Sequence, residues 1–182
     1  MMRTALLMAA MCVPAFAADP HMTAEERTKV IHWLEESRKE FLASIDGVTA
    51  EAMLFGNVEK AMASPPNPAW EEKTKGKTEF IERVMAPRLG KATAPEPIVP
   101  SGKLTQAEVR EKFLAKRAEI EMFAAQTNGA LKEHTVEHPF PVFNTLNAYQ
   151  WLIYIPLHTM RHDKQIAEVK ATAGYPKNVS NP

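Results

Sequence analysis

Apolar positions recur every three or four residues in three long stretches of this 182-residue chain, and no segment shows the period of two that is typical of strands. The stretches predict long helices over about 23–46, 105–128 and 145–172. Shorter apolar stripes predict helices over 51–62 and 77–85. Proline-rich connections at 64–68 and 87–100 separate these elements, because proline disrupts regular helix. We therefore predict an all-α protein that forms a helix bundle.

The first two long helices each begin with a capping box. Thr23 is followed three residues later by Glu26, and Thr105 in the same way by Glu108. In such a pair each side chain can accept a hydrogen bond from the other residue's free backbone N–H. Gly47 is a typical C-terminal stop for the first helix.

The third long helix has two different halves. From 146 to 157 nearly every residue is apolar, which is typical of a helix buried on most sides. Pro156 lacks an N–H for the bond one turn back, so we expect a bend there. The second half is amphipathic, and we expect a frayed tail after Gly174. The preceding stretch 134–143, interrupted by prolines, is predicted to be a loop.

The first seventeen residues read as a targeting segment. Arg3 precedes an apolar run of about ten residues, which is too short to span a bilayer. Small residues at Ala15 and Ala17 then form a signal-peptidase site. We predict cleavage after Ala17, a mature domain over 18–182 and a periplasmic or secreted location. The alternative is an apolar N-terminal helix that stays attached.

The amino-acid composition limits the kinds of chemistry that the mature chain can perform. The only cysteine, Cys12, lies inside the signal and follows Met11 rather than a small residue, so we expect no lipid anchor. The mature chain would then have no thiol for catalysis, metal binding or disulfides. Basic and acidic residues balance at 22 each, which disfavours nucleic-acid binding.

His158 and His162 are the strongest candidates for chemistry. Residues four apart lie on one face of a helix, so both imidazoles can bind one metal ion. Gln165, one turn further on, is a candidate hydrogen-bond partner behind the ligands, and Arg161 at the edge of the stripe is a candidate for an anionic substrate group. The structural alternative is two hydrogen-bonded histidines on a partly buried face. A metal site needs a third ligand from elsewhere.

The remaining histidines and tryptophans have structural interpretations. His134 and His138 precede Pro139 and are predicted to be loop residues. His32 lies beside the apolar stripe of the first helix, as a boundary residue or as the missing third ligand. The tryptophans are predicted to be packing residues: Trp33, Trp70 and Trp151. Three carboxylates show no pairing that suggests carboxylate catalysis: Asp46, Glu59 and Glu137.

The stretch 138–152, HPFPVFNTLNAYQWL, and the motif HTMRHDKQ at 158–165 resemble the last helix of DinB-like proteins. In that family a loop of the His-Pro-x-Phe-Gly-x-Leu kind leads into a helix with His-x-x-Arg-His-x-x-Gln. The segments 33–38 and 55–60 also fit. The resemblance implies a four-helix bundle in up-down-down-up order, with a divalent metal held by three histidines. His158 and His162 match two of them. Some relatives are thiol-dependent transferases or isomerases.

The chain departs from this family pattern at its second helix. Relatives carry the third histidine there, but here no histidine occurs between His32 and His134, and the first half of that helix is missing. Either the metal is lost and the scaffold kept, or His32, Glu59 or a partner subunit completes the site.

Two functional hypotheses follow. The first is a metal-dependent hydrolase or transferase relative, with Zn²⁺ or Ni²⁺ as the preferred ion for imidazole ligands. Export disfavours a cytosolic thiol cosubstrate, so hydrolysis or plain metal binding is preferred. The second is a non-catalytic periplasmic helix-bundle module without metal. In that case the truncated second helix exposes apolar surface that a homodimer or another partner covers.

Overall fold

The computed structural model describes residues 18–44, 49–85, 87 and 104–173, and within them the protein is mostly helical. This confirms the helical class. The helices, in chain order, are α1 (Ala24–Ser44), α2 (Thr49–Met62), α3 (Trp70–Thr74), α4 (Lys77–Met85), α5 (Gln106–Gln126) and α6 (Ala148–Lys170). A small two-stranded sheet, β1 (Thr135–Glu137) and β2 (Thr145–Asn147), precedes α6.

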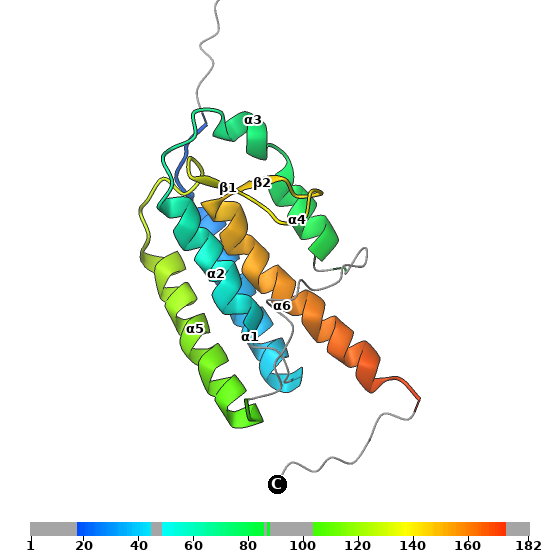
Figure 1. Ribbon diagram of the computed structural model, residues 1–182. Helices are drawn as coiled ribbons and strands as arrows, with labels where there is room; N and C mark the ends of the chain where they lie inside the picture. The colour runs from blue at the N-terminus through cyan, green and yellow to red at the C-terminus, as the bar shows by residue number, and fades with distance from the viewer. Residues whose placement is uncertain (1–17, 45–48, 86, 88–103, 174–182) are drawn as a thin grey trace, which may run out of the picture.

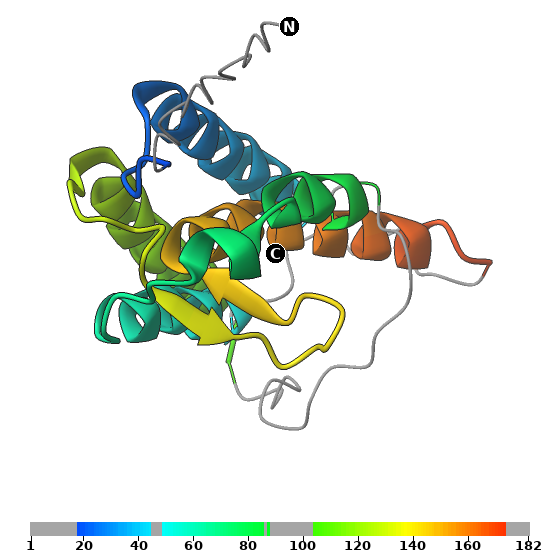
Figure 2. The same ribbon diagram turned by 90° about the horizontal axis from the view of Figure 1, so that it is seen from above.

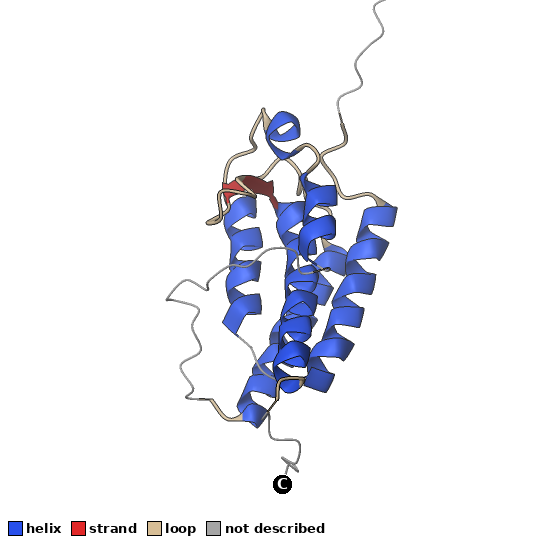
Figure 3. Cartoon of the chain, turned by 90° about the vertical axis from the view of Figure 1, so that its right-hand side faces the viewer, coloured by secondary structure: helices blue, strands red, loops and turns tan. Residues whose placement is uncertain are grey.

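The four longer helices α1, α2, α5 and α6 lie side by side (Figures 1 and 3). In the view of Figure 1, α1 and α6 run downward, whereas α2 and α5 run upward. Helix α6 packs against α1, α2 and α4, so it is the element that most of the fold surrounds. The sheet and α3 cover the end of the molecule where α6 begins, and Figure 2 shows α4 alongside α6.

The first half of α6 is the centre of the core. Every residue from Ala148 to Leu157 is buried, which confirms the prediction of a helix enclosed on most sides. The helix continues through Pro156. The α6 core packs against apolar residues of the other helices, chiefly Val30, Leu34, Leu54, Val58, Ile81 and Ile120.

Both predicted capping boxes are present. In the first, the Thr23 N–H donates to Glu26 Oε2 at 2.8 Å and the Glu26 N–H donates to Thr23 Oγ1 at 3.1 Å. Thr105 and Glu108 repeat this exchange at the start of α5. These reciprocal bonds satisfy N–H groups that a helix start otherwise leaves free. The predicted stop at Gly47 lies outside the described residues.

The predicted start of the third long helix was wrong. Residues 145–147 form β2, which pairs antiparallel with β1, so that Val136 lies opposite Leu146. The helix begins after Asn147, whose side chain accepts from the Gln150 N–H while Gln150 caps the Asn147 N–H. This third capping box, together with the turn residue Asn144 at φ 52°, excludes an earlier helix start.

Other sequence predictions differ from the structure or lie outside it. The stretch predicted as a loop at 134–143 contains β1, and α3 was not predicted. The short helix over 77–85 is confirmed. Three predicted features lie outside the described residues: the predicted signal peptide, residues 88–100 of the proline-rich connection and the predicted tail from Gly174. Within the described part of the chain, no helix is long and apolar enough to cross a membrane.

Candidate metal centre

Helix α6 carries both candidate ligands, and its packing fixes their backbone. The Asn147 cap anchors the start of the helix, and the buried first half holds it among α1, α2 and α4. His158 and His162 follow this buried half directly and are themselves partly buried. The two side chains therefore project from a rigid scaffold, as a preorganised site requires.

The two imidazoles converge on each other through the same ring nitrogen. Nε2 of His158 lies 2.8 Å from Nε2 of His162, and the rings meet edge to face with centroids 4.4 Å apart. A divalent ion such as Zn²⁺ binds imidazole nitrogen at about 2.0–2.1 Å. The 2.8 Å contact is a hydrogen bond between the two rings, as the structural alternative predicts, so one Nε2 carries a proton that a shared ion would have to displace.

Gln165 fixes the tautomer of His162. Its carboxamide oxygen lies 2.6 Å from His162 Nδ1. A carboxamide oxygen only accepts, so Nδ1 carries the proton and Nε2 keeps its lone pair. A hydrogen bond of this kind to the outer nitrogen orients metal-binding histidines in many proteins.

His158 is held neutral by its surroundings. Burial lowers the pKa of its imidazole to about 3, and the neighbouring charges of His162, Arg161 and His138 act in the same direction. At neutral pH the ring therefore carries no charge, which is the form that binds metal. Its Nδ1 is buried and has no hydrogen-bond partner among the described residues. The Nδ1 of His162 therefore has a hydrogen-bond partner in Gln165, whereas the Nδ1 of His158 has none among the described residues.

The proposed third ligands do not join the pair. His32 is exposed on α1. Glu59 is exposed on α2 and lines a cavity of about 490 Å³ between α2 and α5. Among the described residues there is no group of three or more His, Cys, Asp or Glu side chains arranged to hold a metal. Asp46 lies outside them. Arg161, predicted at the edge of the stripe, is buried at 9% exposure.

His138 is more than a loop residue. It follows β1 and is buried, with its ring stacked on Trp151 at a centroid distance of 4.7 Å and an interplanar angle of 14°. Its Nδ1 accepts from the Phe140 N–H at 2.9 Å. Tyr154 contacts His138 on one side and stacks on His158 on the other, at 5.2 and 5.4 Å. A continuous series of rings therefore connects the β1–β2 connection with the histidine pair.

The sequence contains a signal for this ring series that apolar periodicity does not reveal. His138, Trp151, Tyr154 and His158 come from a loop and from successive turns of α6, and each is aromatic or imidazole. Trp151 is fully buried, in agreement with a packing role. His134 is less enclosed, and its Nδ1 lies 2.7 Å from the Ser64 carbonyl oxygen, which ties the start of β1 to the end of α2.

Comparison of the chain with protein-family models, with curated proteins and with solved structures found no match.

Proposed function

We propose that this chain is an exported DinB-like protein that binds one divalent metal ion through His158 and His162. The convergence of the two Nε2 atoms at 2.8 Å is the observation that carries the proposal. The residue motif at 158–165 and the paired helix directions, α1 and α6 against α2 and α5, support the family resemblance.

The two imidazole ligands suit a metal ion of intermediate softness, such as Zn²⁺ or Ni²⁺. The His158 ring is neutral, and Gln165 increases the basicity of His162 through its Nδ1–H. A bound Zn²⁺ or Ni²⁺ would supply Lewis acidity and lower the pKa of a coordinated water toward neutrality. The chain would therefore be a relative of metal-dependent hydrolases, since export disfavours a thiol cosubstrate. Within the described residues only two ligands are provided, so the proposal requires further ligands from water, from residues outside that part, or from a partner subunit.

Metal content of the purified mature chain tests this proposal. After loading with Zn²⁺ or Ni²⁺ and desalting, elemental mass spectrometry should find about one ion per chain. The His158→Ala/His162→Ala double variant should lose it. His21→Ala is the matched control, because His21 is exposed and pairs with Asp19 in the segment before α1. Equal metal content in the wild type and the double variant would contradict the assignment.

A second candidate function is a non-catalytic helical module in the periplasm. An exposed apolar side chain favours it: Met122, 55% exposed, lines the cavity between α2 and α5 and gives this face apolar character. In this case a second copy of the chain covers the α2–α5 face. Sedimentation should then show a dimer that Met122→Lys converts to monomer, whereas a monomeric wild type would contradict it.

A further inference from the structure

The segment 18–23, here called the N-terminal strap, is docked along its length. The Pro20 carbonyl accepts a hydrogen bond from the Lys132 N–H at 2.9 Å. Met22 is buried in the core at 8% exposure, and Thr23 caps α1. A segment tied by backbone bonds, an apolar anchor and a helix cap is held in place, unlike most chain termini.

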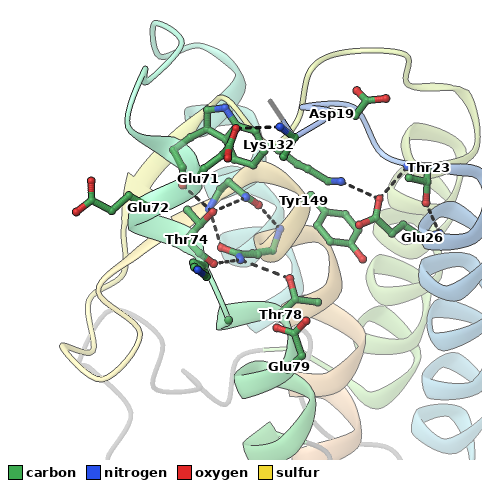
Figure 4. A pocket seen from close by; sticks show the side chains of 16 residues that line it. Asp19, Thr23, Glu26, Glu71, Glu72, Thr74, Thr78, Glu79, Lys132 and Tyr149 are labelled. Atoms are coloured by element: carbon green, nitrogen blue, oxygen red, sulfur yellow. Dashed lines mark hydrogen bonds and ion pairs between the residues drawn. The ribbon is translucent and has the colours of Figure 1, made fainter. Parts of the chain in front are cut away.

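The first residue of the strap contacts a carboxylate group. The backbone nitrogen of Ala18 lies 3.1 Å from Glu71 Oε1, on α3, which is 53 residues away in the sequence. Ala18 and Glu71 both line an open cavity of about 780 Å³ between the strap, α1, α3, α4 and the start of α6, and Figure 4 shows Glu71 there. The contact therefore joins the beginning of the domain to the opposite wall of this cavity.

The cavity has an acidic lining. The charged residues around it are Asp19, Glu26, Glu71, Glu72, Lys75, Glu79 and Lys132. Lys132 pairs with Glu26 at 3.0 Å, and Asp19 pairs with His21 at 2.8 Å. Glu71 is thus the carboxylate that meets the start of the strap, in a region with an excess of negative charge.

We propose that the mature N-terminus is itself a ligand of this cavity: the α-ammonium group of Ala18 binds the carboxylate of Glu71. The proposal rests on the export signal predicted in the proposed function and not on the metal pair. Cleavage adds water across the amide bond between Ala17 and Ala18. The leader leaves with a new carboxylate, and Ala18 keeps the nitrogen as an ammonium with three donors. An uncharged N–H contact thereby becomes a charge-assisted one.

This ion pair between Ala18 and Glu71, here called the clamp, forms only in the processed chain and holds the strap against the cavity. In the precursor the nitrogen is an amide with one hydrogen and no charge, and the chain continues toward the leader. Removal of the leader therefore adds a positive charge at the place where the acidic lining favours one.

Titration of the α-amino group tests the proposal directly. The mature chain is produced from a fusion that leaves Ala18 first, with ¹³C-labelled alanine, and the Ala18 signals are followed by NMR against pH. A free α-amino group titrates at about 7.7–8.0. We expect the value in the folded chain to lie at least half a unit higher, and to return to the ordinary range in Glu71→Gln.

Two further chains complete the test. Glu72→Gln is the matched control, because Glu72 neighbours Glu71 on α3 and should leave the raised value unchanged. A chain that starts at Ala17 moves the ammonium off the site, and its midpoint of thermal unfolding should be lower than that of the mature chain at pH 7. This difference should vanish near pH 10, where the ammonium is deprotonated.

An ordinary titration in the mature chain, or an identical one in Glu71→Gln, would overturn the proposal. So would an exported protein whose first residue, by N-terminal sequencing, is not Ala18. Neither outcome depends on metal, so failure of this clamp and failure of the metal site are distinguishable.

Discussion

Single hydrogen-bond partners set the protonation of two histidines in this protein, His162 and His138. Gln165 accepts from His162 Nδ1, and the Nε2 of the same ring contacts Nε2 of His158. His138 accepts the Phe140 N–H at Nδ1, within a group of aromatic rings. In both cases a neighbour of fixed polarity selects one form of the imidazole.

Replacement of Gln165 by Ala should weaken metal binding without preventing it. The His162 ring would lose the acceptor that orients it, and loss of such a partner typically lowers metal affinity about 10- to 100-fold. Competition with a chromophoric chelator measures the change. Val169→Ala, one turn further along α6 and 55% exposed, serves as the control. An unchanged affinity for Zn²⁺ in Gln165→Ala would show that Gln165 does not support the ligand.

His138 should make stability depend on pH. Burial lowers the pKa of its imidazole to about 4 in the folded protein, against about 6.5 in an unfolded chain. The unfolded state therefore binds more protons between these values, and the free energy of unfolding falls as pH falls from about 6.5 to 4. The full shift corresponds to roughly 3.4 kcal/mol.

His138→Gln keeps a polar acceptor but does not titrate. Urea unfolding at pH 7 and pH 4.5 should show a smaller loss of stability in this variant than in the wild type. His21→Gln, at an exposed position, should behave like the wild type. A loss of stability equal in wild type and His138→Gln would rule out the titration of His138 as its cause.

Among the helices, the caps decide where each one begins. The Asn147 box is buried and also reaches α3, because Asn147 Nδ2 donates to Thr74 Oγ1 at 3.2 Å and Gln150 Nε2 donates to the Thr74 carbonyl at 2.8 Å. The Thr105 box, in contrast, is exposed at the start of α5. The Asn147 box therefore connects two helices, whereas the Thr105 box stabilises only the start of its own helix.

Asn147→Ala should therefore cost more stability than Thr105→Ala. Loss of an exposed cap typically costs about 1 kcal/mol. The buried Asn147 variant also leaves the Gln150 N–H and Thr74 Oγ1 without their partner, which adds about 1–3 kcal/mol. Urea denaturation of both variants measures the difference. Equal losses would mean that the link between α6 and α3 contributes nothing.

The sequence predicted these elements unevenly. The capping boxes at Thr23 and Thr105 were visible because their two members lie three residues apart beside an apolar stripe. The Asn147 box was not recognised, because the apolar Leu146 continues the apolar stretch of α6. Strand β2 is buried at all three positions, so it shows no alternation. Three-residue strands are too short for periodicity to detect.

Across the fold as a whole, Arg117 connects three helices. It lies on α5 with a fully buried side chain, and its Nη1 donates to the Leu34 carbonyl at 2.5 Å and to Ser37 Oγ at 2.6 Å, both on α1. Its Nη2 lies 3.3 Å from Thr159 Oγ1 on α6, next to His158. One guanidinium thus holds α1, α5 and α6 together beside the histidine pair.

Arg117→Lys should destabilise the fold by about 2–4 kcal/mol, because an ammonium cannot donate in the fixed fork that spans two helices and its charge stays buried. Lys116→Arg, at the neighbouring and partly exposed position, should change stability by less than about 0.5 kcal/mol. Thermal unfolding of the two variants provides the comparison. A stable Arg117→Lys protein would show that the fork is not needed to hold the helices.

The sequence predicted the histidine pair of the candidate site but not the residues that surround it. Spacing of four on a helix places His158 and His162 together in any sequence. The neutrality of His158 depends on burial by elements far away in the chain, and the stacked ring of His138 depends on the β1–β2 connection. These tertiary contacts have no local sequence signature.

The shared metal ion is tested most sharply by an NMR titration of the imidazole nitrogens of the six histidines with Zn²⁺. At one equivalent, the Nε2 signals of both His158 and His162 should move to metal-bound positions, while the His162 Nδ1 remains protonated. The His21, His134 and His138 signals should not change. A titration in which the Nε2 signals of His158 and His162 do not both move would contradict a shared metal ion.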